Sequence, residues 1–299
     1  MTLLELFGGI GAIRKAIENL GIDLEWHDYV EIDKTACSAY NIIFNESFEP
    51  KSVLDYKCQV KDIDLLCHGS PCQDFSVAGK RDLEKGRSLL YLKTIDIVND
   101  TKPKIVIWEN VKNILSKENI THVKYYIESL KDYNSYYKVL NSLDFGVPQS
   151  RERVFVVSIR KDLDNNKFNF DNLEKIKTKH IDYFLNNINK YEQGKLKKET
   201  NNYYYIDNSG RPNGQFNRVW KFDKHIGTIA CVRSLKLGFR INENIFWRYL
   251  EPKEAWNLMG FGNDYEKVSK IIPESKLYKL AGNSIVVNVL EQILKKLLF

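Results

Sequence analysis

The sequence lacks the features that mark membrane proteins, disulfide-rich proteins and zinc proteins. No apolar run approaches the roughly 20 residues that a membrane-spanning helix needs, and Met1–Phe7 has neither a basic leader nor a cleavage pattern. The five cysteines are irregularly spaced without a Cys-x-x-Cys pair, and the five histidines are scattered. We therefore expect a cytoplasmic globular protein with no disulfide framework and no metal, in which one cysteine can serve as a reactive thiol.

The positive charge of the chain is concentrated in one segment. The 299 residues carry a formal net charge of +6. Residues 161–245 contain 16 Lys and Arg against 10 Asp and Glu, whereas the remainder contains 29 of each. A surface that faces a polyanion would explain this excess, and so would a solvated lysine-rich face. The charge alone does not choose between them.

Over the first 160 residues, short β-like runs alternate with amphipathic helical stretches. The expected strands are Thr2–Phe7, Leu24–Val30, Ile63–Cys67, Lys104–Trp108, Tyr136–Leu140 and Arg153–Ile159. The expected helices are Ala12–Leu20, Asp33–Phe44, Leu89–Val98 and His122–Leu130. This alternation predicts the α/β class, with a Rossmann-like, doubly wound and mostly parallel sheet that has helices on both faces.

A second, smaller domain is expected after that sheet. Residues 165–245 are rich in Asn, Lys and Tyr and have weak periodicity, so we predict irregular structure there. Regular patterning returns over 246–299, where Pro252 marks a helix start and Ile285–Leu298 reads as an amphipathic helix. The chain is thus expected to divide into residues 1–164, 165–245 and 246–299.

A glycine-rich turn, Phe7-Gly8-Gly9-Ile10-Gly11, follows the first expected strand. Glycines let the chain turn tightly and let a ligand approach the main chain. Glu31 lies 20 residues after Gly11 at the end of the second strand, where an acid hydrogen-bonds ribose hydroxyls. Asp64 opens the third strand, from which its carboxylate could reach an adenine amino group. The turn indicates a cofactor that contains a nucleoside, and the spacing departs from the G-x-G-x-x-G of nicotinamide enzymes.

Three further segments carry candidate chemistry. Cys72 follows a proline on a polar loop after the third strand, at the edge where such sheets place their active sites. Glu109 follows the next strand and should lie at the same edge. Arg151 and Arg153 are separated by one residue on an expected strand, so both should point to the same face of the sheet. One of them could bind a phosphate or a carbonyl oxygen there. Each segment alone has an ordinary structural explanation, but their order behind the glycine-rich turn favours an active site.

Taken in order, these segments resemble the motifs of the cytosine-C5 DNA methyltransferase family, of the bacterial or phage type that depends on S-adenosylmethionine. The resembling segments span nearly the whole chain and are Leu6–Gly11, Glu31–Asp33, Asp64–Cys67, Pro71–Gln73, Arg87–Leu90, Glu109–Val111, Gln149–Arg153, Arg248–Gly260 and Ala281–Ser284. Two positions depart from the family pattern. Glu5 stands where the family often has Asp, and Gly86 precedes Arg87 where an acidic residue is common.

The resemblance implies transfer of a methyl group from S-adenosylmethionine to C5 of a cytosine in a specific duplex DNA sequence, with S-adenosylhomocysteine as product and no metal. Because C5 is a poor nucleophile, a Cys72 thiolate would first add to C6 of the ring. Glu109 would hydrogen-bond N3 and Arg153 would bind O2, with Arg151 beside it near phosphate or the thiolate. The target base must flip out of the duplex to react.

The resemblance also assigns ligand contacts. The residues expected at the cofactor are Phe7, Gly8, Gly9, Ile10, Gly11, Glu31, Ile32, Asp64, Leu65, Pro71, Leu90, Asn283 and Ile285. The residues expected at the DNA are Gln73, Ser76, Lys80, Arg81, Arg87, Arg218, Thr228, Arg233 and Arg240. The loop Ser76–Arg87 would close over the flipped base.

The same resemblance gives each segment a role. Residues 1–164 would form the catalytic and cofactor-binding domain, 165–245 the target-recognition domain, and 246–299 would return to the catalytic domain with the last helix beside the first. The expected partner is duplex DNA, bound by a monomer, with any cognate restriction endonuclease acting separately.

Three alternatives stay open. A cytosine-C5 methyltransferase acting on tRNA shares the fold and nearly every motif, but the usual Cys-Phe-Thr signature of that branch is missing here. A non-catalytic DNA-binding relative is disfavoured by intact Cys72, Glu109 and Arg153. A nicotinamide oxidoreductase would bind NAD and no methyl donor. The pattern does not indicate which DNA sequence is recognised.

Overall fold

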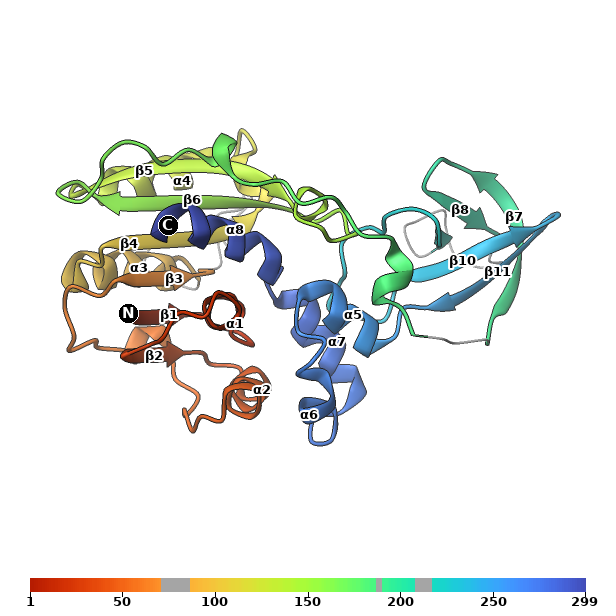
Figure 1. Ribbon diagram of the computed structural model, residues 1–299, viewed down its shortest axis with the longest axis horizontal. Helices are drawn as coiled ribbons and strands as arrows, with labels where there is room; N and C mark the ends of the chain where they lie inside the picture. Colours follow the sequence, from red (N-terminus) through yellow and green to blue (C-terminus); the bar gives the residue numbers. More distant parts are fainter. Residues whose placement is uncertain (71–86, 187–189, 208–216) are drawn as a thin grey trace. The chain divides into compact units, whose positions relative to one another are not determined.

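The computed structural model describes residues 1–70, 87–186, 190–207 and 217–299. The chain divides into two compact units (Figure 1). Unit 1 comprises Met1–Leu140, Glu152–Leu173 and Leu290–Phe299, and unit 2 comprises Asn141–Arg151 and Glu174–Val289. Within the described ranges, no helix combines the length and the apolar character needed to cross a membrane.

Unit 1 is built on a six-stranded sheet with the strand order β2-β1-β3-β4-β6-β5. The strands are β1 (Thr2–Leu6), β2 (Trp26–Val30), β3 (Leu65–His68), β4 (Ile105–Val111), β5 (Tyr133–Asn141) and β6 (Glu152–Arg160). Strands β2, β1, β3 and β4 run parallel to one another, and β6 runs antiparallel to β4. The predicted mostly parallel sheet is confirmed, and the predicted strands fall within a few residues of the observed bounds.

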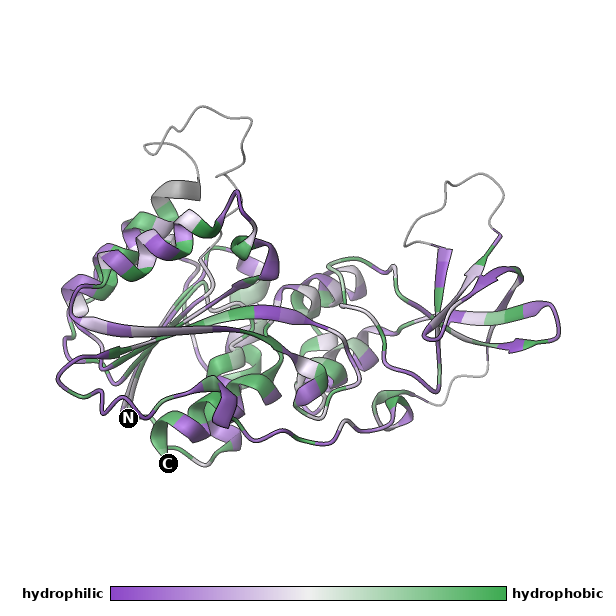
Figure 2. Cartoon of the chain, turned by 90° about the horizontal axis from the view of Figure 1, so that it is seen from above, coloured by the Kyte–Doolittle hydropathy of each residue, from purple (hydrophilic) through white to green (hydrophobic). Residues whose placement is uncertain are grey.

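Helices follow the strands of unit 1 as the alternation predicts. They are α1 (Ala12–Asn19), α2 (Lys34–Phe44), α3 (Arg87–Thr101) and α4 (Ile120–Ser129). Asp33 caps the start of α2: its carboxylate accepts hydrogen bonds from the amides of Thr35 and Ala36 and so satisfies two donors at the helix start. Figure 2 shows hydrophilic and hydrophobic residues interleaved along the helices, the pattern of elements with one buried side.

Alternate residues of the central strands face opposite sides of the sheet. On one side, Leu4 of β1 and Trp108 of β4 belong to a buried cluster with Tyr91 of α3 and Tyr126 of α4. The last helix, α8 (Val287–Leu298), ends in unit 1. The side chain of Asn19 in α1 donates a 2.7 Å hydrogen bond to Glu291 of α8, so the first and last helices are in contact.

Unit 2 contains a closed barrel with the strand order β10-β11-β7-β8-β9. The strands are β7 (Glu192–Glu199), β8 (Tyr203–Ile206), β9 (Arg218–Lys221), β10 (Lys236–Ile241) and β11 (Asn244–Tyr249). Its interior is a small cluster that includes Tyr204, Val219 and Trp247. The sequence predicted irregular structure here because the strands are short and their outward residues are Lys, Tyr and Asn.

Three helices follow the barrel: α5 (Pro252–Met259), α6 (Tyr265–Ser269) and α7 (Glu274–Asn283). Arg248 and Glu254 connect β11 to α5 through two hydrogen bonds of 2.8 Å, and both side chains are almost fully buried. The boundaries of the compact units differ from those of the predicted segments. Residues 246–289 lie in unit 2, and only residues 290–299 return to unit 1. The side chain of Gln149 contacts Met259 of α5, which helps to keep residues 141–151 in unit 2.

Candidate functional site

The turn between β1 and α1 requires glycine at two positions. A Cβ on Gly8 would lie 2.6 Å from the Tyr29 ring, and a Cβ on Gly11 would lie 2.4 Å from the Phe44 ring. Gly11 also has a φ of 80°, in the left-handed region that favours glycine. Aromatic side chains therefore pack directly against the turn and fix the path of the chain from β1 into α1.

The same turn holds a strained residue and an open side. Phe7 and Gly9 both have a φ of 56°. For a bulky residue such as Phe7 this conformation costs about 1–3 kcal/mol, and strain of this kind clusters at ligand sites. Apart from Gly9 and its two chain neighbours, no atom of the described residues lies within 4 Å of the Cβ position of Gly9, whereas the side chain of Ile10 is buried. A ligand can therefore approach the main chain of the turn at Gly9.

Glu31 directly follows β2 and contacts this turn. Its Oε2 accepts a 3.1 Å hydrogen bond from the Gly9 amide, and its Oε1 accepts one of 2.8 Å from the Asp33 amide. The Tyr29 hydroxyl donates a 2.7 Å hydrogen bond to the Gly9 carbonyl. The next residue, Ile32, is 67% exposed and offers an apolar surface beside the acid. Unit 1 thus brings together the glycine-rich turn and the acid that the sequence pattern paired.

Asp64 lies at the end of the sheet where the parallel strands begin, opposite the end that carries the glycine-rich turn. Its two carboxylate oxygens accept hydrogen bonds of 2.7 Å from the Thr2 amide and 2.6 Å from the Lys104 ammonium group. These partners lie where β1 and β4 begin, which is on the order of 13 Å from the glycine-rich turn at about 3.3 Å per residue. The expected contact of Asp64 with adenine is therefore wrong. The Leu65 side chain, only 1% exposed within the sheet, is not available to the cofactor either.

Glu109 and Arg153 meet at the edge where β4 ends and β6 begins. The Nε of Arg153 lies 3.1 Å from Oε1 of Glu109, and the two side chains are only 17% and 14% exposed. The antiparallel pairing of β4 with β6 brings these residues together, because Glu109 pairs with Phe155 and Val111 pairs with Arg153. This ion pair unites two of the predicted catalytic residues.

The chain that leaves β3 reaches the same edge. The side-chain amide of Asn110 donates a 3.0 Å hydrogen bond to the carbonyl of Ser70. A Cβ on Gly69 would lie 3.8 Å from Oε2 of Glu109. Asn110, a member of the Glu109–Val111 motif, therefore holds the chain at Ser70, a contact that the motif itself did not specify.

Several predicted residues lie outside the described part of the chain. They are Pro71, Cys72, Gln73, Ser76, Lys80 and Arg81, together with the side chain of Arg87. Their assignments stay predictions. Leu90, expected at the cofactor, lies in the first turn of α3 and packs against the buried cluster of unit 1.

His68, at the end of β3, has a structural place. Its ring stacks on Trp108 with centroids 5.9 Å apart, and its Nε2 lies 2.8 Å from the Tyr126 hydroxyl. Burial lowers the pKa of His68 to about 3, so the ring stays neutral near pH 7. This histidine is therefore not an acid–base group for the reaction.

Arg151 does not share the position of Arg153. Strand β6 begins at Glu152, so the alternation that should point both arginines to one face does not include Arg151. Its guanidinium, in a residue only 4% exposed, donates to the carbonyls of Ile229, Gly282 and Ser284 in unit 2. Three main-chain oxygens of unit 2 are thus partners of Arg151, and its expected place near phosphate or the thiolate stays a prediction.

The remaining DNA candidates lie in unit 2 and differ in their partners. Arg240 pairs with Glu199 at 2.7 Å, and Arg233 pairs with Glu251 at 3.4 Å. The guanidinium of Arg218 instead lies over the rings of Tyr203 and Tyr205, 5.1 and 5.9 Å from their centroids. Among the described residues, no carboxylate forms an ion pair with Arg218. The Thr228 hydroxyl, on an exposed residue, donates a 2.8 Å hydrogen bond to the Ser150 carbonyl.

The two cofactor candidates of unit 2 are the last residue of α7 and a residue just after the helix. Asn283 is exposed, and its Oδ1 accepts a 2.9 Å hydrogen bond from the thiol of Cys231. Ile285 is half-buried. Their role at the cofactor stays a prediction.

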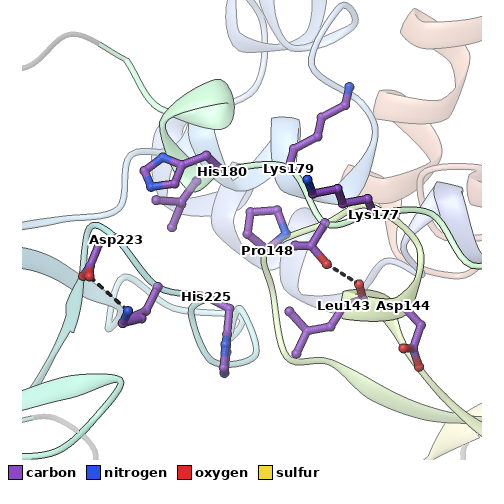
Figure 3. A pocket seen from close by; sticks show the side chains of 11 residues that line it. Leu143, Asp144, Pro148, Lys177, Lys179, His180, Asp223 and His225 are labelled. Atoms are coloured by element: carbon purple, nitrogen blue, oxygen red, sulfur yellow. Dashed lines mark hydrogen bonds and ion pairs between the residues drawn. The ribbon is translucent and has the colours of Figure 1, made fainter.

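Unit 2 also contains an open cavity of about 880 Å³ that no motif indicated (Figure 3). It is lined by Leu143, Asp144, Pro148, Lys177, Thr178, Lys179, His180, Ile181, Asp223, Lys224 and His225. Lys224 pairs with Asp223 at 3.1 Å, so part of the positive charge is neutralised within the cavity. The three lysines face two aspartates, which leaves only a weakly basic lining.

One segment near the glycine-rich turn escaped the sequence reasoning. The Lys51 amide donates a 2.8 Å hydrogen bond to the Glu31 carbonyl, and Ser52 begins a short 3₁₀ helix, Val53–Asp55. Residues 51–53 thus lie beside the acid, in the neighbourhood that Asp64 was expected to occupy. They belong to no strand or long helix, so periodicity gave no signal for them.

Comparison with known proteins identifies the family of the chain. The family model described as C-5 cytosine-specific DNA methylase matches residues 1–298. The Type II methyltransferase M.HhaI of Haemophilus parahaemolyticus is 31% identical over 313 residues, covering 98% of this chain and 93% of that protein. The Type II methyltransferase M.NgoBI of Neisseria gonorrhoeae is 31% identical over 312 residues, covering 96% and 90%.

Among solved structures, the fold is similar to that of the S. pombe Dnmt2 methyltransferase. The TM-score is 0.75 at 19% identity, with 100% of both chains covered. The Entamoeba histolytica methyltransferase EhMeth gives the same TM-score and identity, with 99% of this chain and 97% of that chain covered. At this level of identity the likeness supports the fold alone.

Proposed function

Since the chain belongs to the C-5 cytosine-specific DNA methylase family and is a DNA cytosine-C5 methyltransferase, we propose that it acts through a covalent adduct between Cys72 and C6 of a flipped cytosine. The observation that carries this proposal is the Glu109–Arg153 pair at the edge from which residues 69 and 70 lead to Cys72. The pair offers a carboxyl group and a guanidinium side by side in a largely buried place, as the charge that develops on the ring requires.

The reaction needs three contributions from the chain. The sulfur of Cys72 bonds to C6, which moves electron density toward N3 and O2 and makes C5 nucleophilic. Glu109 holds a proton at N3, and Arg153 donates to O2, so that the charge is stabilised where it develops. S-adenosylmethionine supplies the sulfonium methyl group and leaves as S-adenosylhomocysteine. A base, for which water suffices, removes the C5 proton, and the bond between sulfur and C6 breaks to release Cys72.

The residues around the glycine-rich turn fit a nucleoside-containing methyl donor. The open side at Gly9 lets the ligand contact the main chain, and Glu31 presents a carboxylate at the same place for ribose hydroxyls. Ile32 offers an exposed apolar surface for the base. The positive φ of Phe7 is consistent with a strained ligand site.

We propose that residues of unit 2 contact the duplex around the flipped base. Thr228 is a candidate for a phosphate contact because it is exposed, and its hydroxyl would exchange its bond to the Ser150 carbonyl for one to a phosphate oxygen. Arg218 is better placed than Arg233 or Arg240 to read a base edge, because its guanidinium has no carboxylate partner among the described residues. The monomeric state, the cytoplasmic location, a separate restriction endonuclease and the assignment of catalytic and target-recognition domains belong to this proposal.

The decisive test is covalent trapping on duplex DNA that contains 5-fluorocytosine, since fluorine at C5 cannot leave as a proton does. Wild type with S-adenosylmethionine should give a complex that survives denaturing electrophoresis, and Cys72→Ser should give none. Radiolabelled methyl transfer to duplex DNA and to tRNA should be run in parallel. Labelling of tRNA alone would overturn the choice of DNA, and binding without transfer would favour a non-catalytic relative.

The ion pair has a test of its own. Glu109→Gln keeps the shape of the side chain but removes the group that holds the N3 proton, so kcat should fall by roughly 10²- to 10⁴-fold. The matched control is Glu152→Gln, because Glu152 is a neighbouring acid that pairs with Lys112 on the surface. Equal kcat values for the two variants would remove Glu109 from the mechanism.

A further inference from the structure

One buried guanidinium connects two segments of unit 2 that are far apart in the sequence. The Arg151 side chain donates to the Ile229 carbonyl at 3.3 Å, to the Gly282 carbonyl at 2.9 Å and to the Ser284 carbonyl at 2.8 Å. Hydrogen bonds from a charged donor are among the stronger ones in a protein, and they cost more to break when buried. Neither segment can move without disturbing the bonds of the other.

The two segments also touch each other directly. A Cβ on Gly282 would lie 2.5 Å from the main chain of Ala230 and 2.6 Å from that of Cys231, so glycine is needed for this approach. The exposed Cys231 thiol donates a 2.9 Å hydrogen bond to Oδ1 of Asn283. We refer to residues 228–231 as the target loop and to residues 281–284 as the cofactor turn.

The target loop is held on its other side by residues that precede β6. Oε1 of Gln149 accepts a 3.0 Å hydrogen bond from the Ile229 amide. Thr228 donates to the Ser150 carbonyl at 2.8 Å, and the Ser150 amide donates to the Ile226 carbonyl at 2.8 Å. The loop, the turn and Arg151 therefore form one hydrogen-bonded junction within unit 2.

We propose that Arg151 is a positioning residue that couples DNA binding to cofactor binding. The inference rests on the proposed function, in which Thr228 of the target loop contacts DNA and Asn283 of the cofactor turn contacts the methyl donor. Each ligand favours the same arrangement of the junction, so binding of one lowers the cost of ordering it for the other. Such coupling is reciprocal, and its usual size is roughly 5- to 150-fold in affinity.

The test compares the Kd of duplex DNA with and without saturating S-adenosylhomocysteine. Wild type should bind its DNA at least about 5-fold more tightly with the ligand. Arg151→Lys keeps the charge, but its compact ammonium group cannot reproduce the fork that spans three carbonyls. Its ratio of Kd values should therefore approach one. A purely structural loss would weaken both measurements and leave their ratio unchanged.

Two more variants make the result decisive. Cys231→Ala changes an exposed residue, so the fold should survive, and it should lower the ratio by removing the bond to Asn283. Arg248→Lys is the matched control, because Arg248 is an equally buried arginine of unit 2 that bonds to Glu254 outside the junction. It should lose stability and keep the wild-type ratio.

The inference is overturned if wild type shows a ratio of one, or if Arg151→Lys and Cys231→Ala both keep the wild-type ratio. Should Arg151→Lys fail to fold, Cys231→Ala decides by itself. Methyl transfer by wild type, measured in the same preparation, separates this outcome from a failure of the proposed function.

Discussion

Glu5 carries a prediction about pH and stability. Its side chain is 1% exposed within β1, and its Oε1 accepts a 2.7 Å hydrogen bond from the Tyr40 hydroxyl. Burial raises the pKa of Glu5 from an ordinary 4.5 to about 8, although the Tyr40 hydrogen bond and the charge of Arg14 lower it in part. The folded protein therefore keeps Glu5 protonated at neutral pH, whereas the unfolded chain ionises it.

The sign of the effect follows from this difference. Below pH 4.5 both states hold the proton, so the group has no effect on the free energy of unfolding. As the pH rises from 4.5 toward 8, only the unfolded chain gains by releasing the proton, and stability falls. Since a tenfold change in an equilibrium is about 1.4 kcal/mol, the loss is at most about 5 kcal/mol and complete by about pH 8.

Glu5→Gln should remove this dependence, because the amide does not titrate and keeps nearly the same shape. Urea unfolding of both proteins at pH 5, 6, 7, 8 and 9 measures the difference in free energy. That difference should shift in favour of the variant by up to about 1.4 kcal/mol per pH unit until pH 8. Tyr40→Phe should widen the window, since it removes a hydrogen bond that lowers the pKa of Glu5. Parallel curves for wild type and Glu5→Gln would refute the reasoning.

Three further predictions concern other parts of the chain. Gly11→Ala places a Cβ against an aromatic ring at a φ of 80°, so it should lower stability by more than about 1 kcal/mol and abolish the thermal shift caused by S-adenosylhomocysteine. Asp64→Asn should leave cofactor affinity unchanged, as isothermal calorimetry can measure. The hydrogen bonds from Lys104 and the Thr2 amide outweigh burial and lower the pKa of Asp64. The ionised Asp64 carboxylate therefore stabilises the fold at neutral pH, and this stabilisation should be lost below about pH 4. Glu254→Gln should cost about 3–5 kcal/mol in urea unfolding because it leaves the buried Arg248 charge without its partner; a loss below 1 kcal/mol would mean that the pair is hydrated.

Local pattern was sufficient wherever a feature depends on neighbouring residues. The glycine-rich turn and the placement of Glu31 after β2 followed from glycine chemistry and strand periodicity, and both occur as expected. Glu109 and Arg153 were expected to act together, and the antiparallel pairing of β4 with β6 brings them to 3.1 Å. The sequence also placed the final helix, whose hydrophobic period is regular over its whole length.

Two predicted side-chain positions, those of Asp64 and Arg151, differ from the structure because each residue lies one position before the strand to which it was assigned. Asp64 precedes β3 by one residue, so it belongs to the end of the sheet where the parallel strands begin and not to the end that holds the glycine-rich turn. Arg151 precedes β6 by one residue, which removes it from the alternation of that strand and sends its guanidinium to three carbonyls. Alternation has a period of two, so the bounds of a strand decide which face and which edge a side chain joins.

The sequence by itself determined the class of the fold, the order of its elements and the residue types of the site, because these depend on local periodicity and on motifs read in order. Only the tertiary structure revealed the barrel. Its strands β10 and β9, and β11 and β7, pair although they are distant in sequence, and local periodicity does not predict which distant strands pair. The tertiary structure also decided which charged residues are free to act. Arg153 and Arg151 are two residues apart, yet one meets Glu109 in unit 1 and the other joins two segments of unit 2, because hydrogen-bond partners come from parts of the chain that are distant in sequence.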